Sequence, residues 1–298
     1  MRAVIVTNPA AARADEAHLL AARARLVAAG LAVEIARTGA PGDGARLARE
    51  AVAAGAEVVI AHGGDGTAMD IAAAIVGSDV SLGLLPAGTG NLLAGNLHIP
   101  RPWRAATGVI LAGAVRRIDI GRLITPAGTR YFAVACGAGF DAELMRSTAA
   151  PHKRAFGMGA YVATAVSLAT AITRSQVRIV ADGAVGHEGQ AAMLLIANCG
   201  ELIPGLLPLR ADIRPDDGVF DVAVLDAASI PAAARMVWRM LLRRPESDPG
   251  ITFLRATSLR VTATPALPVQ ADGEGAGTTP MTVEMLPRAL AVLAPGGA

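Results

Sequence analysis

The sequence predicts an α/β domain with a parallel sheet, followed by a second, mainly β domain. Two observations support this prediction. Up to about residue 112, short apolar strands alternate with helical segments and short loops, which is typical of a parallel sheet covered on both faces. Beyond that point the alternation stops, and strand-like segments follow one another with few helices between them. The boundary is expected within residues 113–119.

The elements of the first domain are predicted from apolar periodicity and from the glycine and proline residues between segments. Strands are expected at 2–7, 31–37, 58–61 and 81–85. Helices are expected at 15–29, 44–54, 68–75 and 103–112, with a further short helix after residue 91. In the second domain, strands are expected at 116–124, 131–136, 176–181, 190–198, 219–225, 258–262 and 267–271.

The amino-acid composition argues against some classes of function. Of the 298 residues, 53% are hydrophobic, which is enough for a packed core. Only 17% are charged and 3% aromatic, and the net charge is +2, so nucleic-acid binding is not supported. Cys136 and Cys199 have no metal-type spacing and are expected to be reduced and buried. No signal peptide is expected, and the uncharged segment 155–173 is expected to be a buried helix rather than a membrane span.

A glycine turn follows the third strand, at Gly63-Gly64-Asp65-Gly66-Thr67. Glycine enters positive φ freely and lets backbone N–H groups approach a ligand, and a helix N-terminus attracts phosphate. A carboxylate in such a turn repels bare phosphate, so Asp65 indicates a metal-bound nucleotide. The alternative is a turn that uses glycine for geometry alone, with Asp65 or Thr67 as an ordinary N-cap.

A second glycine turn, Gly88-Thr89-Gly90-Asn91, follows the fourth strand, while Asn8 and Thr38 follow the first two. Ligands of parallel α/β sheets bind at the carboxyl ends of the strands. Four successive strand ends that carry glycine or small polar residues therefore favour a binding site over a purely structural turn.

The sequence lacks two common nucleotide-binding motifs, the P-loop and the protein-kinase signatures. The basic residues are arginines except for Lys153, which has no glycine frame before it, so the chain has no P-loop. The signatures of protein kinases are also absent from the sequence.

Two acidic turns lie in the second half, at Asp216-Asp217-Gly218 and at Asp272-Gly273-Glu274. Either could be an ordinary hairpin turn, because Asp-Gly is favoured where φ is positive.

Taken together, these motifs resemble the diacylglycerol kinase catalytic-domain family of bacterial lipid kinases, which also includes the sphingosine kinases. The resemblance spans nearly the whole chain. NAD kinases share the first glycine turn, whereas the second turn and the late Asp-Gly-Glu favour the lipid kinases. The segments that carry the resemblance are 8–9, 63–67, 88–91, 119–121, 137–141, 198, 216–218 and 272–274.

The resemblance implies an NAD-kinase-like first domain with a Rossmann-like parallel sheet, at 1–118 joined by 284–298, and a β-sandwich-like lipid domain at 119–283. The active site would lie in the cleft between them. By analogy, ATP would contact the glycine turns with Asn8, Thr38 and Thr89, and Asp65 would orient the magnesium-bound phosphates. Glu274 matches the proton acceptor of the family, and Asp272 lies beside it.

Asp217, with Asp216 beside it, resembles a residue that binds a structural Mg²⁺ in some members of the family. Arg214 stands nearby where an oxygen donor would serve better, since a cation offers Mg²⁺ no lone pairs. Asp141 matches a position where a lipid head group could be read, with a structural role as the alternative.

The leading hypothesis is an ATP- and Mg²⁺-dependent kinase that phosphorylates the hydroxyl of diacylglycerol or a related lipid alcohol. It would be cytoplasmic, would reach the inner membrane surface by peripheral contact, and could form a homodimer. The segment 202–208 is a candidate apolar rim, or else a buried loop. The alternatives are an NAD-kinase-like enzyme with a soluble substrate and a non-catalytic nucleotide- or lipid-binding regulator.

Overall fold

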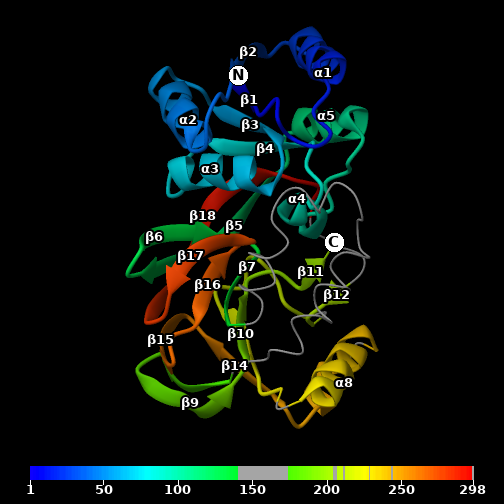
Figure 1. Cartoon of the computed structure of the whole chain (residues 1–298). Helices are drawn as coiled ribbons and strands as arrows, with labels where there is room; N and C mark the ends of the chain where they lie inside the picture. Colours follow the sequence, from blue (N-terminus) through cyan, green and yellow to red (C-terminus); the bar gives the residue numbers. More distant parts are fainter. Residues whose placement is uncertain (140–173, 204–206, 211, 228, 243, 297–298) are drawn as a thin grey trace. The chain divides into compact units, whose positions relative to one another are not determined.

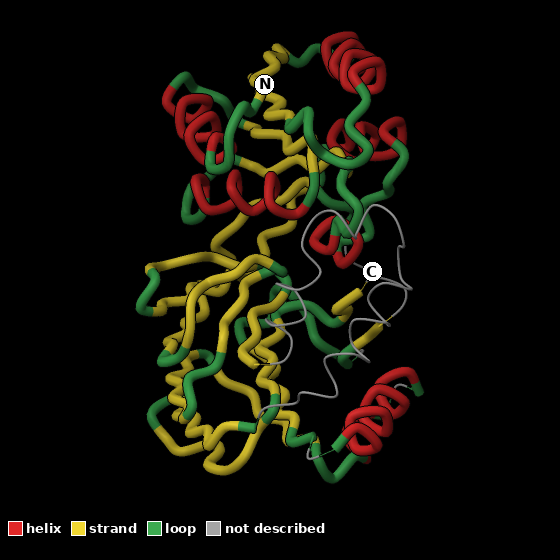
Figure 2. The backbone as a smooth tube through the Cα atoms, in the orientation of Figure 1, coloured by secondary structure: helices red, strands yellow, loops and turns green. Residues whose placement is uncertain are grey.

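The computed structural model describes residues 1–139, 174–203, 207–210, 212–227, 229–242 and 244–296. The chain divides into two compact units, drawn in Figures 1 and 2. Unit 1 comprises Met1–Ile120 and Pro287–Ala298, and unit 2 comprises Gly121–Leu286. The chain passes from one unit to the other within two long strands, β5 (Val115–Thr125) and β18 (Met281–Leu293).

Unit 1 is an α/β domain with a parallel sheet in the order β2-β1-β3-β4-β18. Its other strands are β1 (Arg2–Thr7), β2 (Ala32–Arg37), β3 (Val58–Gly63) and β4 (Ser81–Pro86). Its helices are α1 (Glu16–Ala28), α2 (Asp43–Ala53), α3 (Asp65–Ile75), α4 (Leu92–Asn96) and α5 (Trp103–Ala112).

The helices of unit 1 pack in two pairs, α1 with α5 and α2 with α3 (Figure 1). The strand order places these pairs on opposite faces of the sheet, because parallel crossovers are right-handed. The sheet is therefore buried on both sides, and every residue of β3 is buried, as its continuous apolar run predicts. The predicted parallel α/β fold is confirmed.

The returning end of β18 completes unit 1. Ala291 and Val292 pair in parallel with Ser81 and Leu82 of β4. The buried carboxylate of Asp119 accepts a hydrogen bond from the backbone N–H of Arg288 at 2.6 Å. A strand from the far end of the sequence thus joins the sheet of unit 1, which local periodicity does not reveal.

Unit 2 is built from antiparallel strands. One sheet has the order β14-β13-β10-β7-β16-β17, and a second set contains β18-β15-β8-β9 together with the β5-β6 pair. The strands not yet given are β6 (Gly128–Phe132), β7 (Ala135–Gly139), β8 (Ser175–Ala181), β9 (Ala184–Ala191), β10 (Met193–Ala197), β11 (Glu201–Ile203), β12 (Leu207–Pro208), β13 (Phe220–Leu225), β14 (Ile251–Ala256), β15 (Ser258–Thr264), β16 (Pro268–Ala271) and β17 (Glu274–Thr278).

A single apolar core joins the two sheets of unit 2. Strands of both sheets contribute to it, and the rings of Phe132 and Phe220 stack there with centroids 5.5 Å apart. A shared core between two antiparallel sheets defines a β-sandwich, so the predicted sandwich-like second domain is also confirmed.

The structure corrects several element boundaries. Helix α3 begins at Asp65 rather than at residue 68, because the glycine turn itself enters the helix. The strands expected at 131–136 and 190–198 are each broken, the first between β6 and β7 and the second between β9 and β10. Strands β11, β12, β14, β17 and β18 were not predicted, and neither were helix α8 (Ile230–Leu241) and the short 3₁₀ helix η1 (Pro245–Ser247).

Candidate functional site

The first glycine turn joins β3 to α3 with almost no spare space. Gly64 is extended at φ −95° and ψ −168° and forms the N-cap of α3. A Cβ atom on Gly63 would lie only 2.5 Å from Oγ1 of Thr67, which is itself buried. Glycine is therefore required at this position for the helix to start where it does. The start of a helix offers backbone N–H groups to an anion.

The second glycine turn packs directly on the first. A Cβ on Gly88 would overlap the Cα of Gly64, so the two backbones touch. Asn91, left-handed at φ 54°, closes the second turn: its Oδ1 accepts from the N–H of Gly88 at 2.9 Å, and its Nδ2 donates to the carbonyl of Gly88 at 2.8 Å. The two motifs, 24 positions apart in the sequence, form one structure.

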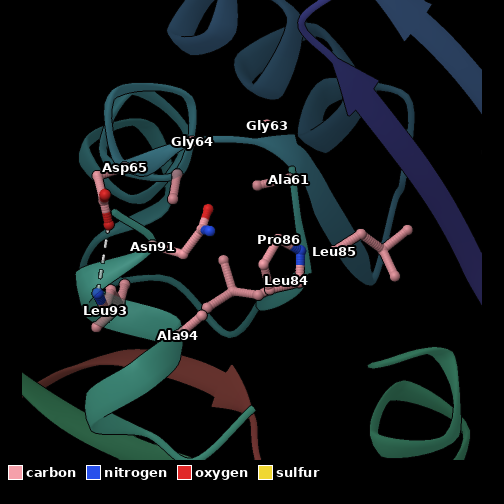
Figure 3. Close-up of a pocket in the computed structure, with 11 residues that line it drawn as sticks. Ala61, Gly63, Gly64, Asp65, Leu84, Leu85, Pro86, Asn91, Leu93 and Ala94 are labelled. Carbon is pink, nitrogen blue, oxygen red and sulfur yellow. Dashed lines mark hydrogen bonds between the residues drawn. The ribbon is translucent and has the colours of Figure 1, made fainter. Parts of the chain in front are cut away.

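Asp65 ties the two turns together. Its Oδ1 accepts hydrogen bonds from two backbone N–H groups at the start of α4, that of Leu92 at 2.5 Å and that of Leu93 at 3.4 Å, the second of which is drawn in Figure 3. Burial raises the pKa of Asp65 above its usual value, and these N–H groups oppose the rise. The carboxylate thus stabilises the second turn, whatever further role it has.

A small pocket lies between the two turns and the ends of β3 and β4 (Figure 3). Its walls combine glycine backbone and the Asp65 and Asn91 side chains with an apolar floor. The lining residues are Ala61, Gly63, Gly64, Asp65, Ala68, Leu84, Leu85, Pro86, Asn91, Leu93 and Ala94. Thr89 is exposed at the rim of the second turn.

The other predicted residues of unit 1 lie at the same edge of the sheet. The N–H of Asn8 donates to the carbonyl of His62 at 3.0 Å, and the N–H of Thr38 donates to the carbonyl of Thr7 at 2.9 Å. Because β1 to β4 are parallel and in register, their carboxyl ends meet at one edge. The structure therefore gathers Asn8, Thr38 and both glycine turns at that edge.

Sequence reasoning missed one polar pair at this edge. The buried side chains of Thr7 and His62 meet, with Oγ1 and Nδ1 2.8 Å apart. Burial lowers the pKa of His62, so the ring is neutral at physiological pH. The available signal was a polar residue at the end of each of two apolar strands.

In unit 2, the side chain of Asp272 stabilises the backbone where strand β6 ends and strand β7 begins. Its carboxylate accepts three backbone hydrogen bonds, from Ala133 at 2.7 Å, Val134 at 3.0 Å and Ala135 at 2.9 Å. From another side, Nδ2 of Asn198 donates to the carbonyl of Ala133 at 2.8 Å. Asp272 therefore replaces the strand pairing that these N–H groups would otherwise make.

Glu274 differs from Asp272 although it stands two residues away. Its side chain is 58% exposed, and its Oε2 lies 3.5 Å from Nη1 of Arg130. In the turn between them, the N–H of Gly273 donates to Oε1 of the buried Gln270 at 2.7 Å. The turn is thus tied to β16 by a hydrogen bond, while the Glu274 carboxylate is exposed to solvent.

The predicted metal residues are paired with arginines. Asp217 accepts from Nη2 of Arg255 at 2.8 Å, and Asp216 accepts from Nε of Arg214 at 3.3 Å. Within the described part of the chain, no group of three or more His, Cys, Asp and Glu residues could hold a metal ion. A Mg²⁺ ion bound here would compete with two guanidinium groups and would depend on water and backbone carbonyls for most of its ligands.

The remaining predictions concern the two cysteines, Asp141 and two apolar segments. Cys136 and Cys199 are buried and form no disulfide, as predicted. Asp141, the segment 155–173, Pro204, Gly205 and Leu206 lie outside the described residues. Over the residues that are described, no helix is long and apolar enough to span a bilayer.

Two protein-family models match this chain, one in its first part and one in its second part. The model of the "Diacylglycerol kinase catalytic domain" matches residues 2–123, and that of the "YegS C-terminal NAD kinase beta sandwich-like domain" matches residues 134–294. The chain belongs to the family of diacylglycerol kinases and YegS-like lipid kinases, which combines these two domains.

Full-length relatives support this membership. The chain is 31% identical over 297 residues to a "Probable lipid kinase YegS-like" of Chromohalobacter salexigens, covering 98% of this chain and 93% of the relative. It is 28% identical over 298 residues to a "Diacylglycerol kinase" of Bacillus subtilis, covering 99% and 96%.

Solved structures agree on the fold. A diacylglycerol kinase from Bacillus anthracis superposes with a TM-score of 0.75 at 21% identity, covering 99% of this chain and 97% of the other. An NAD kinase from Archaeoglobus fulgidus in complex with ATP superposes with a TM-score of 0.53 at 14% identity, covering 99% and 94%. The two-domain fold is therefore common to lipid kinases and NAD kinases.

Proposed function

We propose that this protein is an ATP-dependent lipid kinase that transfers the γ-phosphate to a hydroxyl of diacylglycerol or a related lipid alcohol. The observation that carries the proposal is the contact between the two glycine turns, made by a chain that matches lipid kinases over its full length. We assign nucleotide binding to residues 1–118 with 284–298, and lipid binding to residues 119–283.

The edge of the unit 1 sheet suits a nucleotide phosphate group. Positive charge is supplied there by helix N-termini rather than by lysine, and the glycines allow a phosphate to reach the backbone. In this proposal Asn8, Thr38, Thr89, Asn91 and both glycine turns contact ATP. Bound Mg²⁺ would neutralise charge on the phosphates, and Asp65 would orient the metal-bound group.

Glu274 is the proposed general base for the acceptor hydroxyl. Phosphoryl transfer needs in-line positioning and a residue that takes the proton of the attacking hydroxyl. An exposed carboxylate on a hydrogen-bonded turn suits that need, whereas the Asp272 carboxylate is engaged by three backbone N–H groups. We assign Asp272 the task of positioning the turn that carries Glu274.

A soluble acceptor is the second candidate. It is favoured by the fold shared with the NAD kinase that binds ATP. The two candidates use the same nucleotide site and differ only in the acceptor bound by unit 2.

Two further parts of the proposal concern metal and location. Asp216 and Asp217 are proposed to bind a structural Mg²⁺, in exchange for their arginine partners. The enzyme would work in the cytoplasm at the inner membrane surface, and a homodimer is a possible assembly.

The test is transfer of labelled phosphate from Mg-ATP into diacylglycerol and into a total bacterial lipid extract, both dispersed in detergent micelles. We expect labelled lipid with the wild-type protein. Glu274→Gln should lower the turnover rate by about 10² to 10⁴, the usual contribution of a well-placed base. The labelled product identifies the acceptor.

Glu188→Gln is the matched control, because Glu188 is also an exposed glutamate of unit 2, 56% accessible and close to an arginine. Its turnover rate should equal that of the wild type. With NAD offered as a third acceptor, labelling of NAD and not of lipid would favour the soluble-acceptor candidate. A Glu274→Gln enzyme with undiminished turnover would contradict the assigned base.

A further inference from the structure

Helix α8 is attached firmly to unit 2 along one side. Met236 is 2% exposed. Nε and Nη2 of Arg235 donate to the two carboxylate oxygens of Asp248, at 2.7 and 3.0 Å, and the Asp248 side chain is fully buried. The helix also packs against η1, and Figure 1 draws it in yellow. One face of α8 therefore has a fixed direction relative to unit 2.

A second face of α8, which borders the attached side at Arg235, presents apolar side chains to solvent. Pro231, Arg235 and Trp238 of α8 and Leu242, directly after the helix, are spaced at i, i+4, i+7 and i+11 and are all exposed. Trp238 is 61% exposed and Leu242 is 49% exposed. Among the large apolar side chains exposed within the described ranges, Trp238 is the only aromatic one. We call these four residues the α8 face.

The charge around the α8 face is positive. Residues 230–250 contain four arginines and two acidic residues. One of the acids, Asp248, is buried and already neutralised by Arg235. Arg239, on the next turn of the helix, makes a long contact of 3.4 Å from Nη1 to Oγ of Ser247. An incoming surface therefore meets tryptophan and leucine flanked by arginine.

We propose that the α8 face is a docking surface for an anionic lipid bilayer. Tryptophan is enriched at membrane–water interfaces, and amphipathic helices with basic flanks bind anionic lipid surfaces. Among the described side chains of this region, Trp238 and Leu242 are the exposed large apolar residues, and two side chains offer far less area than the about 800 Å² that a stable protein interface buries on each partner. The inference deepens the proposed function, since a kinase of membrane lipids has to reach the bilayer that holds its substrate.

The experiment measures co-sedimentation with vesicles, without nucleotide and without diacylglycerol. The probes are vesicles of phosphatidylcholine alone and of phosphatidylcholine mixed with phosphatidylglycerol. The wild-type protein should bind the mixed vesicles and not the neutral ones. Trp238→Ala and Arg239→Gln should each weaken binding to the mixed vesicles by roughly tenfold.

Val185→Ala is the matched control, because Val185 is a 52% exposed apolar residue elsewhere in unit 2. Its binding should equal that of the wild type. A second readout uses the Trp103→Phe background, in which Trp238 is the only tryptophan. Its fluorescence should shift to shorter wavelength with the mixed vesicles and stay unchanged with the neutral ones.

The proposal is overturned if the wild type fails to bind mixed vesicles, or if Trp238→Ala binds them as the wild type does. It is also overturned if Trp238→Ala changes the oligomeric state, because the α8 face would then be covered by another copy. Phosphorylation of diacylglycerol in detergent micelles needs no docking to a bilayer. Kinase activity in micelles therefore tests the proposed function separately, and Trp238→Ala should retain it.

Discussion

Asp65 in unit 1 and Asp272 in unit 2 invite comparison. Each stands beside a glycine in a turn, and each matches a position that the family resemblance links to catalysis. In the structure both carboxylates accept backbone hydrogen bonds from a remote segment, Asp65 from Leu92, 27 positions away, and Asp272 from Ala135, 137 positions away. Both aspartates therefore stabilise a turn. For each of them, a structural role must be tested before a catalytic role is assigned.

The two aspartates differ in what their removal would leave behind. Asp272 accepts hydrogen bonds from three successive backbone N–H groups at the break between β6 and β7. Asp65 bridges two turns that already touch through Gly64 and Gly88. Unit 2 thus depends on its carboxylate for local structure, while unit 1 depends more on its glycines.

The largest effect on stability is expected for Asp272→Ala. Each backbone N–H left without its acceptor costs about 1–3 kcal/mol, so the free energy of unfolding should fall by at least about 3 kcal/mol. Asp272 also has φ 45°, which alanine adopts less readily than aspartate. Urea denaturation measures the change. Glu274→Gln is the control and should leave the unfolding free energy unchanged; equal stability of both variants would contradict the comparison.

A smaller effect is expected for Gly88→Ala. The added methyl group would press on the backbone of Gly64, and overpacking of this kind costs about 1–3 kcal/mol. Binding of a fluorescent ATP analogue should be lost as well, because the two turns would separate.

Gly108→Ala is the matched control for this substitution. Gly108 lies inside α5, where a Cβ would meet only Nη2 of Arg25, at 3.9 Å. Alanine should stabilise the helix there by about 0.5–1 kcal/mol. If Gly88→Ala proved as stable as Gly108→Ala and still bound the analogue, the contact between the turns would contribute neither to stability nor to nucleotide binding.

The smallest expected effect is on the pH dependence of the unfolding free energy. The contributions of Asp65 and Asp182 to this dependence should have opposite signs. Burial raises the pKa of Asp65 in the folded state, so its ionisation destabilises the fold. The unfolding free energy of the wild type, relative to Asp65→Asn, should therefore fall as pH rises from about 4 through the folded pKa.

Asp182 in unit 2 provides the contrast. Its Oδ1 accepts from Oγ1 of Thr257 at 2.8 Å, and these hydrogen bonds lower its pKa. The stability that it contributes should be present above about pH 4 and be lost as pH falls through the folded pKa. Urea denaturation of both Asn variants across this range checks the signs, and two slopes of the same sign would refute the assignment.

Much of unit 1 could be predicted because its information is local. The apolar runs of β1, β3 and β4 and the glycine turns after them lie within single short segments. Parallel strands then bring their carboxyl ends to one edge by geometry alone, so the neighbourhood of Asn8, Thr38 and both turns was foreseeable. The pairing of Thr7 with His62 was not, since it needs the register of β1 against β3.

Unit 2 was harder to predict because its decisive contacts are remote in sequence. Residues 131–136 have the composition of one strand, yet Asp272 divides them by taking the N–H groups of Ala133, Val134 and Ala135. Helix α8 was missed among strand-like segments, and its exposed face depends on which side Met236 and Arg235 attach.

The sequence by itself therefore determined the succession of β1 to β4 and their helices along the chain, the two glycine turns and the family, because periodicity and turn chemistry act over a few residues. Only the tertiary structure decided which acid is engaged and which is exposed. Asp272 and Glu274 stand two positions apart, and their different surroundings come from segments more than 130 positions away. Burial and hydrogen bonding depend on those distant neighbours, and no local pattern encodes them.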